Sequence, residues 1–437
     1  MKEYPPVSLQ IQEMNPAGQG LAIKDGKTYL VWNALAGEKV IARICGKSKH
    51  AFDAVALEII EPSADRISSV ESHHLSCSPW QIMSRPAEDR LKHQILCRLI
   101  EQLWPDLDKT LLPGPLVSGA QDFGYRNKME YSFIETDDRV RLAFFDRGTH
   151  RRTAIEPCVL ADDAINRAAR SVLGRLRQSA ASHGGMLKSL ILRSDGRQGV
   201  LAGLFVMREV DAASLGLDRP VEGCDGFFLY YSRPSSPAST TDRLLVHWGA
   251  DTLEMRVLDS VLKMGLLSFF QVNAQLFAGV VADLKALVGS GETLLDYYSG
   301  VGSIGINLAR VFKQCLLIDN SPENIRFAAE NIQAAGLTNT RAILTPAEKA
   351  LDFIETGCTV ILDPPRSGLH PKLIERLLSV RPVRVLYLSC SPVTLARDLE
   401  LLKSAYRLTA VKGYNFFPRT PHIECLCVLE RTELSVR

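Results

Sequence analysis

The sequence has no long hydrophobic run and no strong excess of charge of one sign. No apolar stretch in the 437 residues approaches the roughly 18 residues that a membrane-spanning helix needs, so we expect no membrane partner. Lysine and arginine total 51 against 49 acidic residues, and the net charge of +2 excludes a histone-like protein that binds by bulk charge. The first ten residues contain no hydrophobic stretch typical of a signal peptide, so we expect no secretory leader.

The sequence also lacks a dense cysteine framework. Ten cysteines are scattered along the chain, a pattern typical of reduced thiols, and we expect a cytoplasmic protein. Apolar residues make up 46% of the chain and charged residues 23%, which excludes wholesale disorder. A chain of this length is too long for one compact core, and two or three domains are expected.

Hydrophobic patterning divides the chain into three segments. In residues 1–64, short runs that alternate with period two are broken by glycine and proline, which predicts a small antiparallel barrel or sandwich. In residues 65–265 we expect a central α+β domain, in which the spacing from Arg85 to Trp104 predicts a helix that packs on the catalytic domain. Residues 266–437 then form the third, catalytic domain.

The last segment alternates apolar strands with helix-compatible stretches. The strand-like runs are LLDYY, CLLID, RAILT, TVILD and RVLYLSC. This alternation predicts an α/β fold with a parallel sheet covered by helices. Two further strand-like runs, RLTAVKGY and HIECLCVLER, follow with no helix between them. A closing antiparallel pair gives a seven-stranded mixed sheet, which resembles the Rossmann-like fold of class I methyltransferases.

A glycine-rich loop follows the first of these strands. Gly300 and Gly302 let the backbone turn sharply before a helix begins, and Asp319 ends the next strand, 19 residues after Gly300. An acid at this place is suited to accept both hydroxyls of a ribose. A packing turn with a solvated acid is the alternative. A nucleoside cofactor fits better, and both NAD and S-adenosylmethionine satisfy these features.

Three chemically active side chains fall at the same edge of the predicted sheet. Asp363 ends one strand, Cys390 ends the next, and Glu424 lies on the final strand. Each alone has a plainer explanation: a helix cap, a buried thiol and a solvated acid. Together, a thiol and carboxylates beside a methyl-donor pocket suit methylation of an unactivated ring carbon. Addition of a thiolate to carbon 6 of uracil turns carbon 5 into a nucleophile, and a base then removes the proton from carbon 5.

These residues resemble the RNA uracil-5-methyltransferases, which make 5-methyluridine in ribosomal RNA and tRNA. The resemblance covers essentially the whole chain. Its most specific pieces are the FQVN run from Phe270, the loop from Asp296 to Gly302, the DPPRSG run from Asp363, the SCSP run around Cys390, and the HIE run that ends at Glu424. The N-terminal barrel is similar to a TRAM domain, an OB-like RNA-binding module.

The resemblance implies a role for each matching residue. Cys390 is the nucleophile and Glu424 the base. The residues that bind S-adenosyl-L-methionine are Gln271, Tyr298, Gly300, Gly302, Ser303, Asp319 and Asp363. Those expected to contact the RNA are Gln271, Asp363, Tyr125, Arg126 and Lys128, the last three within the family motif Gly124–Lys128. Phe144, Phe145 and Arg147 are further candidates for stacking on or clamping a single-stranded loop.

One departure from the family concerns metal. Many members with a TRAM domain hold a four-iron cluster on four cysteines. The corresponding stretch here, HHLSCSPWQIM, contains only Cys77, and a later position offers Cys158. Two thiols cannot complete the set, so we expect no iron–sulfur cluster and no metal site.

Two other functions compete with the interpretation as an RNA uracil-5-methyltransferase. A class I methyltransferase that acts on nitrogen or on protein needs neither Cys390 nor Glu424. A non-catalytic RNA-binding protein needs neither these residues nor the glycine loop. The barrel joined to this catalytic core favours large-subunit (23S) ribosomal RNA as the partner, with the T-loop of tRNA as the alternative, and we expect a monomer.

Overall fold

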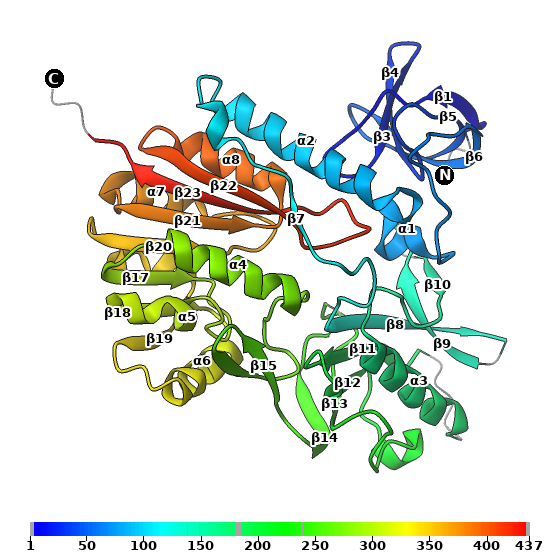
Figure 1. Cartoon of the computed structure of the whole chain (residues 1–437). Helices are drawn as coiled ribbons and strands as arrows, with labels where there is room; N and C mark the ends of the chain where they lie inside the picture. The colour runs from blue at the N-terminus through cyan, green and yellow to red at the C-terminus, as the bar shows by residue number, and fades with distance from the viewer. Residues whose placement is uncertain are drawn as a thin grey trace.

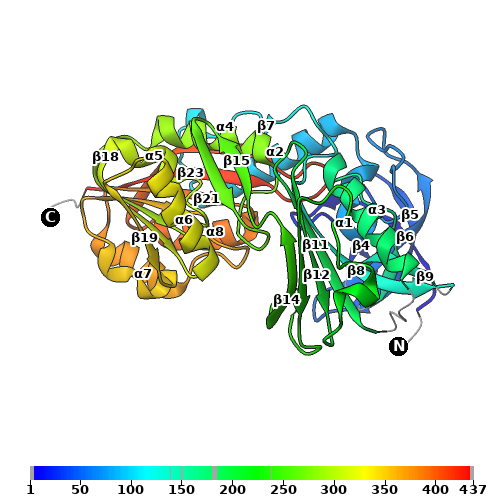
Figure 2. The same ribbon diagram turned by 90° about the horizontal axis from the view of Figure 1, so that it is seen from below.

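Three large sheets, one two-stranded sheet and the helices that cover them form the described part of the protein. The computed structural model describes residues 4–137, 139–147, 149, 151–179, 185–237 and 239–433. Figure 1 shows the N-terminal sheet (blue), the central sheet (cyan to green) and the C-terminal sheet (yellow to red) as separate bodies. Seen from below in Figure 2, the central and C-terminal sheets lie side by side. Among the described residues, no helix has the length and apolar character required to cross a membrane.

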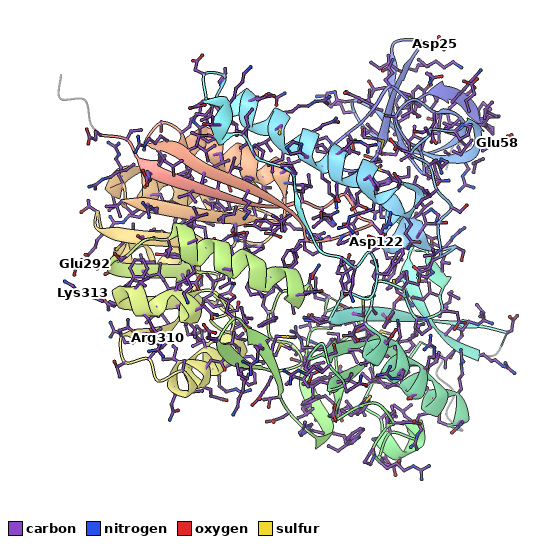
Figure 3. All side chains as sticks on the ribbon, viewed as in Figure 1. Asp25, Glu58, Asp122, Glu292, Arg310 and Lys313 are labelled. Carbon is purple, nitrogen blue, oxygen red and sulfur yellow. The ribbon has the colours of Figure 1, made fainter. Side chains whose placement is uncertain are left out.

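The N-terminal sheet has six strands in the order β1-β5-β6-β4-β3-β2. They are β1 (Val7–Gln10), β2 (Glu13–Met14), β3 (Gly20–Lys24), β4 (Lys27–Trp32), β5 (Lys39–Lys47) and β6 (Phe52–Glu61). Alternate residues such as Leu9, Val31 and Val40 point into one small core. This arrangement is compatible with the predicted barrel. Figure 3 labels Asp25, at the turn between β3 and β4, and Glu58, on β6, on the outside of this body.

The central sheet has seven strands in the order β10-β9-β8-β11-β12-β13-β14. They are β8 (Lys128–Thr136), β9 (Arg139–Phe145), β10 (Arg152–Ala154), β11 (Leu187–Ser194), β12 (Val200–Val206), β13 (Gly226–Tyr231) and β14 (Arg243–Gly249). Helix α3 (Asp163–Gln178) covers one face, and its apolar side joins the core of the sheet through Ile165, Val172 and Leu176. Asp162 caps this helix by accepting a hydrogen bond from the backbone N–H of Ile165.

The C-terminal sheet has the order β19-β18-β17-β20-β21-β23-β22-β7. Its strands are β17 (Gly291–Tyr297), β18 (Phe312–Asp319), β19 (Thr340–Leu344), β20 (Cys358–Leu362), β21 (Arg384–Ser389), β22 (Tyr406–Asn415), β23 (Glu424–Arg431) and the short β7 (Val117–Ser118). The first five in this order are parallel, whereas β23 is antiparallel to both β21 and β22. The predicted seven-stranded mixed sheet is therefore present, and β7 from the middle of the chain adds an eighth strand beside β22.

Helices cover both faces of this sheet. On one face lie α4 (Ala274–Leu287), the short α5 (Gly305–Leu308) and α6 (Pro322–Ala334). On the other face lie α7 (Pro371–Val380), α8 (Pro392–Leu402) and α2 (Arg85–Leu103), which is the helix predicted from Arg85 to Trp104. Both faces of the strands are consequently apolar, as expected for a covered parallel sheet. The β15–β16 hairpin (Leu253–Val257, Ser260–Met264) joins the α4 face.

The strand directions decide which residues meet. β17, β18, β20 and β21 all end at one edge of the sheet. Because β23 runs in the opposite direction, it begins at that same edge, where Cys425 pairs with Ser389 at the end of β21. Residues that follow the parallel strands and residues that open β23 are thus placed together.

Candidate active site

The glycine loop after β17 has a backbone that few side chains tolerate. Tyr298, Gly300 and Gly302 all have positive φ, of 64°, 56° and 86° respectively. At Gly302 an added Cβ would lie 2.7 Å from Ile306 Cδ1 and 2.9 Å from Leu317 Cδ1, so only glycine fits there. A non-glycine residue in this region, such as Tyr298, is strained and is most often found where function requires it. Ser303 follows, half-buried, before α5 begins.

Asp319 holds this loop in place from the end of β18. Its Oδ2 accepts the backbone N–H of Gly300 at 3.0 Å, while Oδ1 accepts Ser321 N at 2.8 Å and Asn324 Nδ2 at 3.0 Å. A carboxylate has about four acceptor positions, so Oδ2 keeps one for a ligand hydroxyl. Asp319 therefore both shapes the loop and offers an acceptor beside it.

Gln271 and Asp363 form a partly buried pair at the same edge. Gln271 Nε2 donates a hydrogen bond to Asp363 Oδ2 at 3.0 Å. Burial raises the pKa of Asp363 to about 7, although the hydrogen bond from Gln271 opposes this shift. A carboxyl group of this kind gains or loses a proton near neutral pH, which makes it sensitive to any charge placed next to it.

Cys390 lies directly after β21, and Ser391 then caps α8 by accepting the backbone N–H of Thr394. The thiol is partly buried. Its pKa is raised to about 12, first by burial and then by the negative charges of Glu424 and Asp363, while Arg366 acts in the opposite direction. The sequence predicted that Asp363, Cys390 and Glu424 lie together at one edge of the sheet. The effects of the two acidic groups on the pKa of Cys390 agree with that placement.

Glu424 is the first residue of β23 and is only 2% exposed. Its Oε1 atom is buried and has no hydrogen-bond partner among the described residues. Burial and the nearby charge of Asp363 raise the pKa of Glu424 well above its usual value. A buried, unsatisfied carboxyl oxygen is costly for stability and is best explained by a ligand that satisfies it.

Two residues of this site were not given a role from the sequence. Arg366 Nη2 lies 3.1 Å from His422 Nε2. Burial and the positive charge of Arg366 lower the pKa of His422 to about 3, so the imidazole is neutral and accepts the hydrogen bond. Arg366 and His422 were within reach of prediction, because they lie inside the DPPRSG and HIE runs.

The Gly124–Lys128 motif lies at the junction of the central and C-terminal sheets. Asn127 donates from its backbone to Val272 O and from its side chain to Gln271 O, each at 3.0 Å. Tyr125 is buried and donates its hydroxyl to Pro418 O at 3.1 Å. Tyr125 is thus packed where it supports the segment leading to Glu424, and is not an open stacking platform.

The two basic residues of this motif differ in environment. Arg126 has a buried Nε without a hydrogen-bond partner among the described residues, and its charge contributes to the low pKa of His422. Arg126 is therefore close enough to His422 for its charge to act on the imidazole. Burial, followed by the charge of Arg193, lowers the pKa of Lys128 to about 7.

A cavity of about 1200 Å³ lies beside the motif. Both arginine and acidic side chains line it, but Cys390 and Glu424 do not.

Comparisons with known proteins agree with this arrangement. Residues 349–432 match a family model described as tRNA (Uracil-5-)-methyltransferase, and residues 271–384 match one described as Conserved hypothetical protein 95. An uncharacterized RNA methyltransferase of Caldanaerobacter subterraneus subsp. tengcongensis is 27% identical over 98% of this chain and 99% of its own length. Another, of Gloeobacter violaceus, is 29% identical over 98% of this chain and 96% of its own length.

A solved structure has the same fold. The Pyrococcus abyssi tRNA (uracil-54, C5)-methyltransferase, in complex with S-adenosyl-L-homocysteine, matches with a TM-score of 0.75. It is 23% identical, and the match covers 97% of this chain and 100% of that chain. The α/β fold class predicted from the sequence is confirmed.

Proposed function

We propose that this chain methylates carbon 5 of a uridine in RNA through a covalent adduct with Cys390, in keeping with its match to a tRNA (Uracil-5-)-methyltransferase family model over residues 349–432 and with its RNA methyltransferase relatives. One observation carries the proposal. Cys390 lies at the sheet edge beside two carboxyl groups, the partly buried Asp363 and the buried Glu424, whose charges both act on the thiol. Methylation of nitrogen or oxygen requires no thiol at this place, whereas an unactivated ring carbon does.

The residues at the glycine loop fit S-adenosyl-L-methionine. Asp319 keeps an acceptor position for a ribose hydroxyl, and the positive φ angles of Gly300 and Gly302 form the sharp turn that this carboxylate holds. The hydroxyl of Ser299 is buried without a hydrogen-bond partner among the described residues, so this pocket has an unsatisfied polar group. Tyr298, Ser303, Gln271 and Asp363 complete the proposed set. When bound, the cofactor supplies an electrophilic methyl group on a positively charged sulfur.

Cys390 starts the reaction on the uracil ring. Its thiolate bonds to carbon 6, and the electrons of the 5,6 double bond move toward the oxygen on carbon 4, which makes carbon 5 nucleophilic. Since burial and the carboxylates keep the thiol protonated in the free protein, attack requires loss of that proton. Arg366 favours this loss because its charge lowers the pKa of Cys390.

Glu424 ends the reaction. After carbon 5 has gained its methyl group, the remaining hydrogen on carbon 5 must leave as a proton. We assign this step to Glu424, because burial and the nearby charge of Asp363 raise its pKa and so make its carboxylate a stronger base than an ordinary one. Breaking of the bond between Cys390 and carbon 6 then restores the double bond and releases the product.

The target uridine must be flipped out of its stack or already unpaired to reach this site. Arg126 and Lys128 are the proposed contacts to the RNA from the central domain, and Gln271 and Asp363 the proposed contacts to the base. Phe145, which is 46% exposed with the Arg152 guanidinium 5.2 Å from its ring, is a candidate stacking surface. Phe144 instead stacks on Tyr131 at 5.5 Å, within the core of the central domain.

For the RNA itself we propose large-subunit ribosomal RNA, because a barrel resembling an RNA-binding module precedes the catalytic domain. The T-loop of tRNA is the second candidate, since the matched family model and the Pyrococcus abyssi enzyme are both described as acting on tRNA. Mapping of 5-methyluridine in ribosomal RNA and tRNA from cells that lack this gene distinguishes them. The uridine that loses its methyl group identifies the substrate.

Release of tritium from RNA labelled at carbon 5 of uridine tests the reaction. We expect wild-type protein to release one tritium for each methyl group transferred, and Cys390→Ala to do neither while it still binds RNA. Cys97→Ser, which changes another partly buried thiol on α2, serves as the matched control and should retain activity. Methyl transfer without tritium release would identify a nitrogen or oxygen methyltransferase, and the absence of any transfer would favour a binding protein.

A further inference from the structure

Four potential metal ligands, none of them a residue with a role in the proposed reaction, converge at one place. Glu71, His73 and Cys77 come from the segment before and within the short helix α1 (His74–Cys77), and Cys158 comes from the loop between β10 and α3. One ligand atom from each of the four lies within 4.8 Å of all the others. The two cysteines are evident as candidate ligands in the sequence, whereas Glu71 and His73 join them only in the folded chain.

The distances between these atoms suit one tetrahedral ion. The Sγ atoms of Cys77 and Cys158 are 3.8 Å apart, and two zinc–sulfur bonds of about 2.3 Å at a tetrahedral angle give roughly 3.8 Å. His73 Nε2 lies 3.4 Å from Glu71 Oε2, where zinc–nitrogen and zinc–oxygen bonds of about 2.0–2.1 Å give roughly 3.3 Å. Cys158 Sγ lies 3.9 Å from the same Glu71 oxygen.

A second, independent observation points to a ligand. His73 is only 9% exposed, and its Nε2 is buried without a hydrogen-bond partner among the described residues. This ring nitrogen lies 3.4 Å from Glu71 Oε2, a separation that suits an ion pair of a protonated imidazole but is longer than a good hydrogen bond. A metal ion bound to both atoms satisfies the buried nitrogen in its neutral form. Zinc is commonly bound through such a nitrogen.

The surroundings orient the carboxylate toward the cluster. Glu71 Oε1 accepts the backbone N–H of Val159 at 2.7 Å, which turns Oε2 to the side of His73 and Cys158. Gln81 Nε2 also donates to Oε2 at 3.1 Å. Outer hydrogen bonds that fix a ligating carboxylate in this way are typical of metal sites.

We propose that Glu71, His73, Cys77 and Cys158 bind a single Zn²⁺ ion as a closed structural site. Four protein ligands leave no open position, which is typical of structural rather than catalytic zinc. The four-iron cluster held by many members of the resembling family does not fit, because it requires four thiolates and the described part of this site has two. The proposal replaces the expectation of no metal and does not depend on the proposed function.

The place of the site indicates what the ion stabilises. It joins the segment 71–77 to the central domain through Cys158. The same segment contacts Arg147, which donates to Leu75 O at 3.0 Å and stacks over the Trp32 ring of the N-terminal sheet at 4.3 Å. A zinc ion here therefore fixes the connection between the N-terminal and central bodies.

Metal analysis of the full chain tests the proposal. Protein purified from zinc-supplemented cells should contain one zinc per chain and no acid-labile sulfide. Cys77→Ser and Cys158→Ser should each lose the zinc, whereas the control Cys97→Ser should keep it. Zinc that persists in the double variant Cys77→Ser/Cys158→Ser, or several irons with sulfide in the wild type, would overturn the proposal.

A measurement on the wild type keeps the test valid if the variants fold poorly. Protein stripped of metal by a chelator should take up one Co²⁺ per chain, with the absorption band of a cobalt–thiolate bond. Zinc should then displace the cobalt and abolish the band. In a thiol titration of the folded chain, two thiols fewer should react in the zinc-loaded form than in the stripped form. Absence of a saturable cobalt–thiolate signal would show that no such site exists.

Discussion

Opposing charges surround the thiol of Cys390. Glu424 and Asp363 raise its pKa and Arg366 lowers it, on top of the dominant effect of burial. The free protein therefore keeps the thiol protonated at neutral pH, since a pKa of about 12 leaves little thiolate there. This protects the nucleophile from alkylation and oxidation until a substrate changes the balance of charge in the pocket.

Glu424→Gln should make Cys390 more reactive in the free protein. Ionised Glu424 opposes formation of the thiolate, so in the pH range where Glu424 is ionised the change lowers the pKa of Cys390, and below the pKa the thiolate fraction rises about tenfold for each unit. Iodoacetamide labelling over a series of increasing alkaline pH values, followed residue by residue with mass spectrometry, measures the rate. Glu430→Gln on the same strand, where the carboxylate pairs with Arg384, is the matched control and should leave the rate unchanged. Equal rates in wild type and Glu424→Gln would contradict the assigned environment.

The residue that caps helix α4, Asn273, makes two hydrogen bonds. They connect the segment that holds Gln271 with the segment that leads to Glu424. The Asn273 side chain accepts the backbone N–H of Leu276 at 3.2 Å and donates to Phe416 O at 3.0 Å. It is 6% exposed. The cap thereby ties the start of α4, which follows Gln271, to the end of β22 and the segment that leads to Glu424.

Asn273→Ala should destabilise the protein by about 2 kcal/mol, the sum of a lost cap of about 1 kcal/mol and a lost buried hydrogen bond of similar size. Chemical denaturation followed by tryptophan fluorescence measures this. Asn273→Asp retains the cap acceptor and loses only the donor to Phe416. Its loss of unfolding free energy should therefore be smaller than that of Asn273→Ala. An alanine variant as stable as wild type would show that the cap contributes nothing.

At the level of elements, patterning predicted much of the fold. The five apolar runs became β17 to β21, since short apolar runs that alternate with helix-compatible segments are typical of parallel strands covered by helices. The short β7 was not predicted, because its pairing with β22 joins residues nearly 300 positions apart and leaves no local signal. The same limit applies to Glu71 and His73, whose meeting with Cys158 is visible only after folding.

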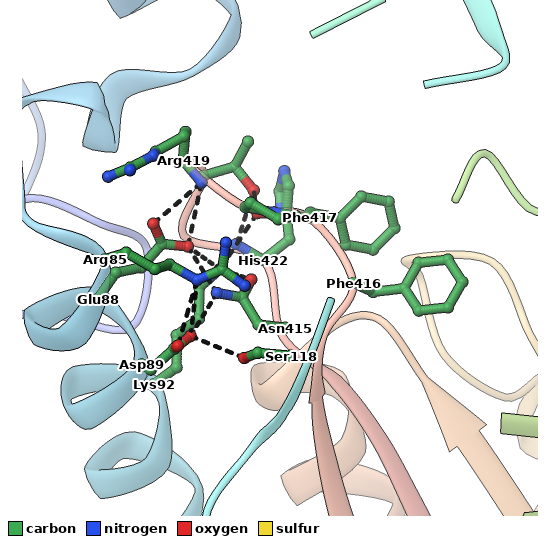
Figure 4. A network of polar contacts seen from close by, with 12 residues as sticks. Arg85, Glu88, Asp89, Lys92, Ser118, Asn415, Phe416, Phe417, Arg419 and His422 are labelled. Carbon is green, nitrogen blue, oxygen red and sulfur yellow. Dashed lines mark hydrogen bonds and ion pairs between the residues drawn. The ribbon is translucent and has the colours of Figure 1, made fainter. Parts of the chain in front are cut away.

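Across the whole molecule, a buried polar network connects α2 to the active-site segment (Figure 4). Lys92 Nζ bonds to Glu88 Oε1 and Asn415 Oδ1, each at 2.7 Å, and to Phe417 O at 3.1 Å. Glu88 also accepts the backbone N–H of Arg419. Nearby, Asp122, labelled in Figure 3, pairs with Arg85 and Arg419. These contacts hold the chain just before His422 and Glu424 against a helix from the other end of the sequence.

Lys92→Met should therefore cost about 3–5 kcal/mol, because it leaves the buried Glu88 without its cation. The double variant Glu88→Gln/Lys92→Met should recover part of that loss. Arg326→Met is the matched control, since Arg326 and Glu330 have the same spacing of four residues but are exposed, and it should cost about 1 kcal/mol or less. Urea denaturation measures the unfolding free energy of each variant. Similar losses in Lys92→Met and Arg326→Met would contradict a special role for the buried pair of Glu88 and Lys92.

The most direct test of the account is the fate of Glu424→Gln with RNA and S-adenosyl-L-methionine. If Glu424 removes the proton from carbon 5, adduct formation and methyl transfer precede its step and release alone stalls. General-base steps contribute typically 10²–10⁴-fold, so the stalled species should persist on a denaturing gel. Mass spectrometry is then predicted to find protein plus RNA plus one methyl group, joined at Cys390. Free 5-methyluridine product formed at the wild-type rate, with no adduct, would contradict the assignment of Glu424 as the base.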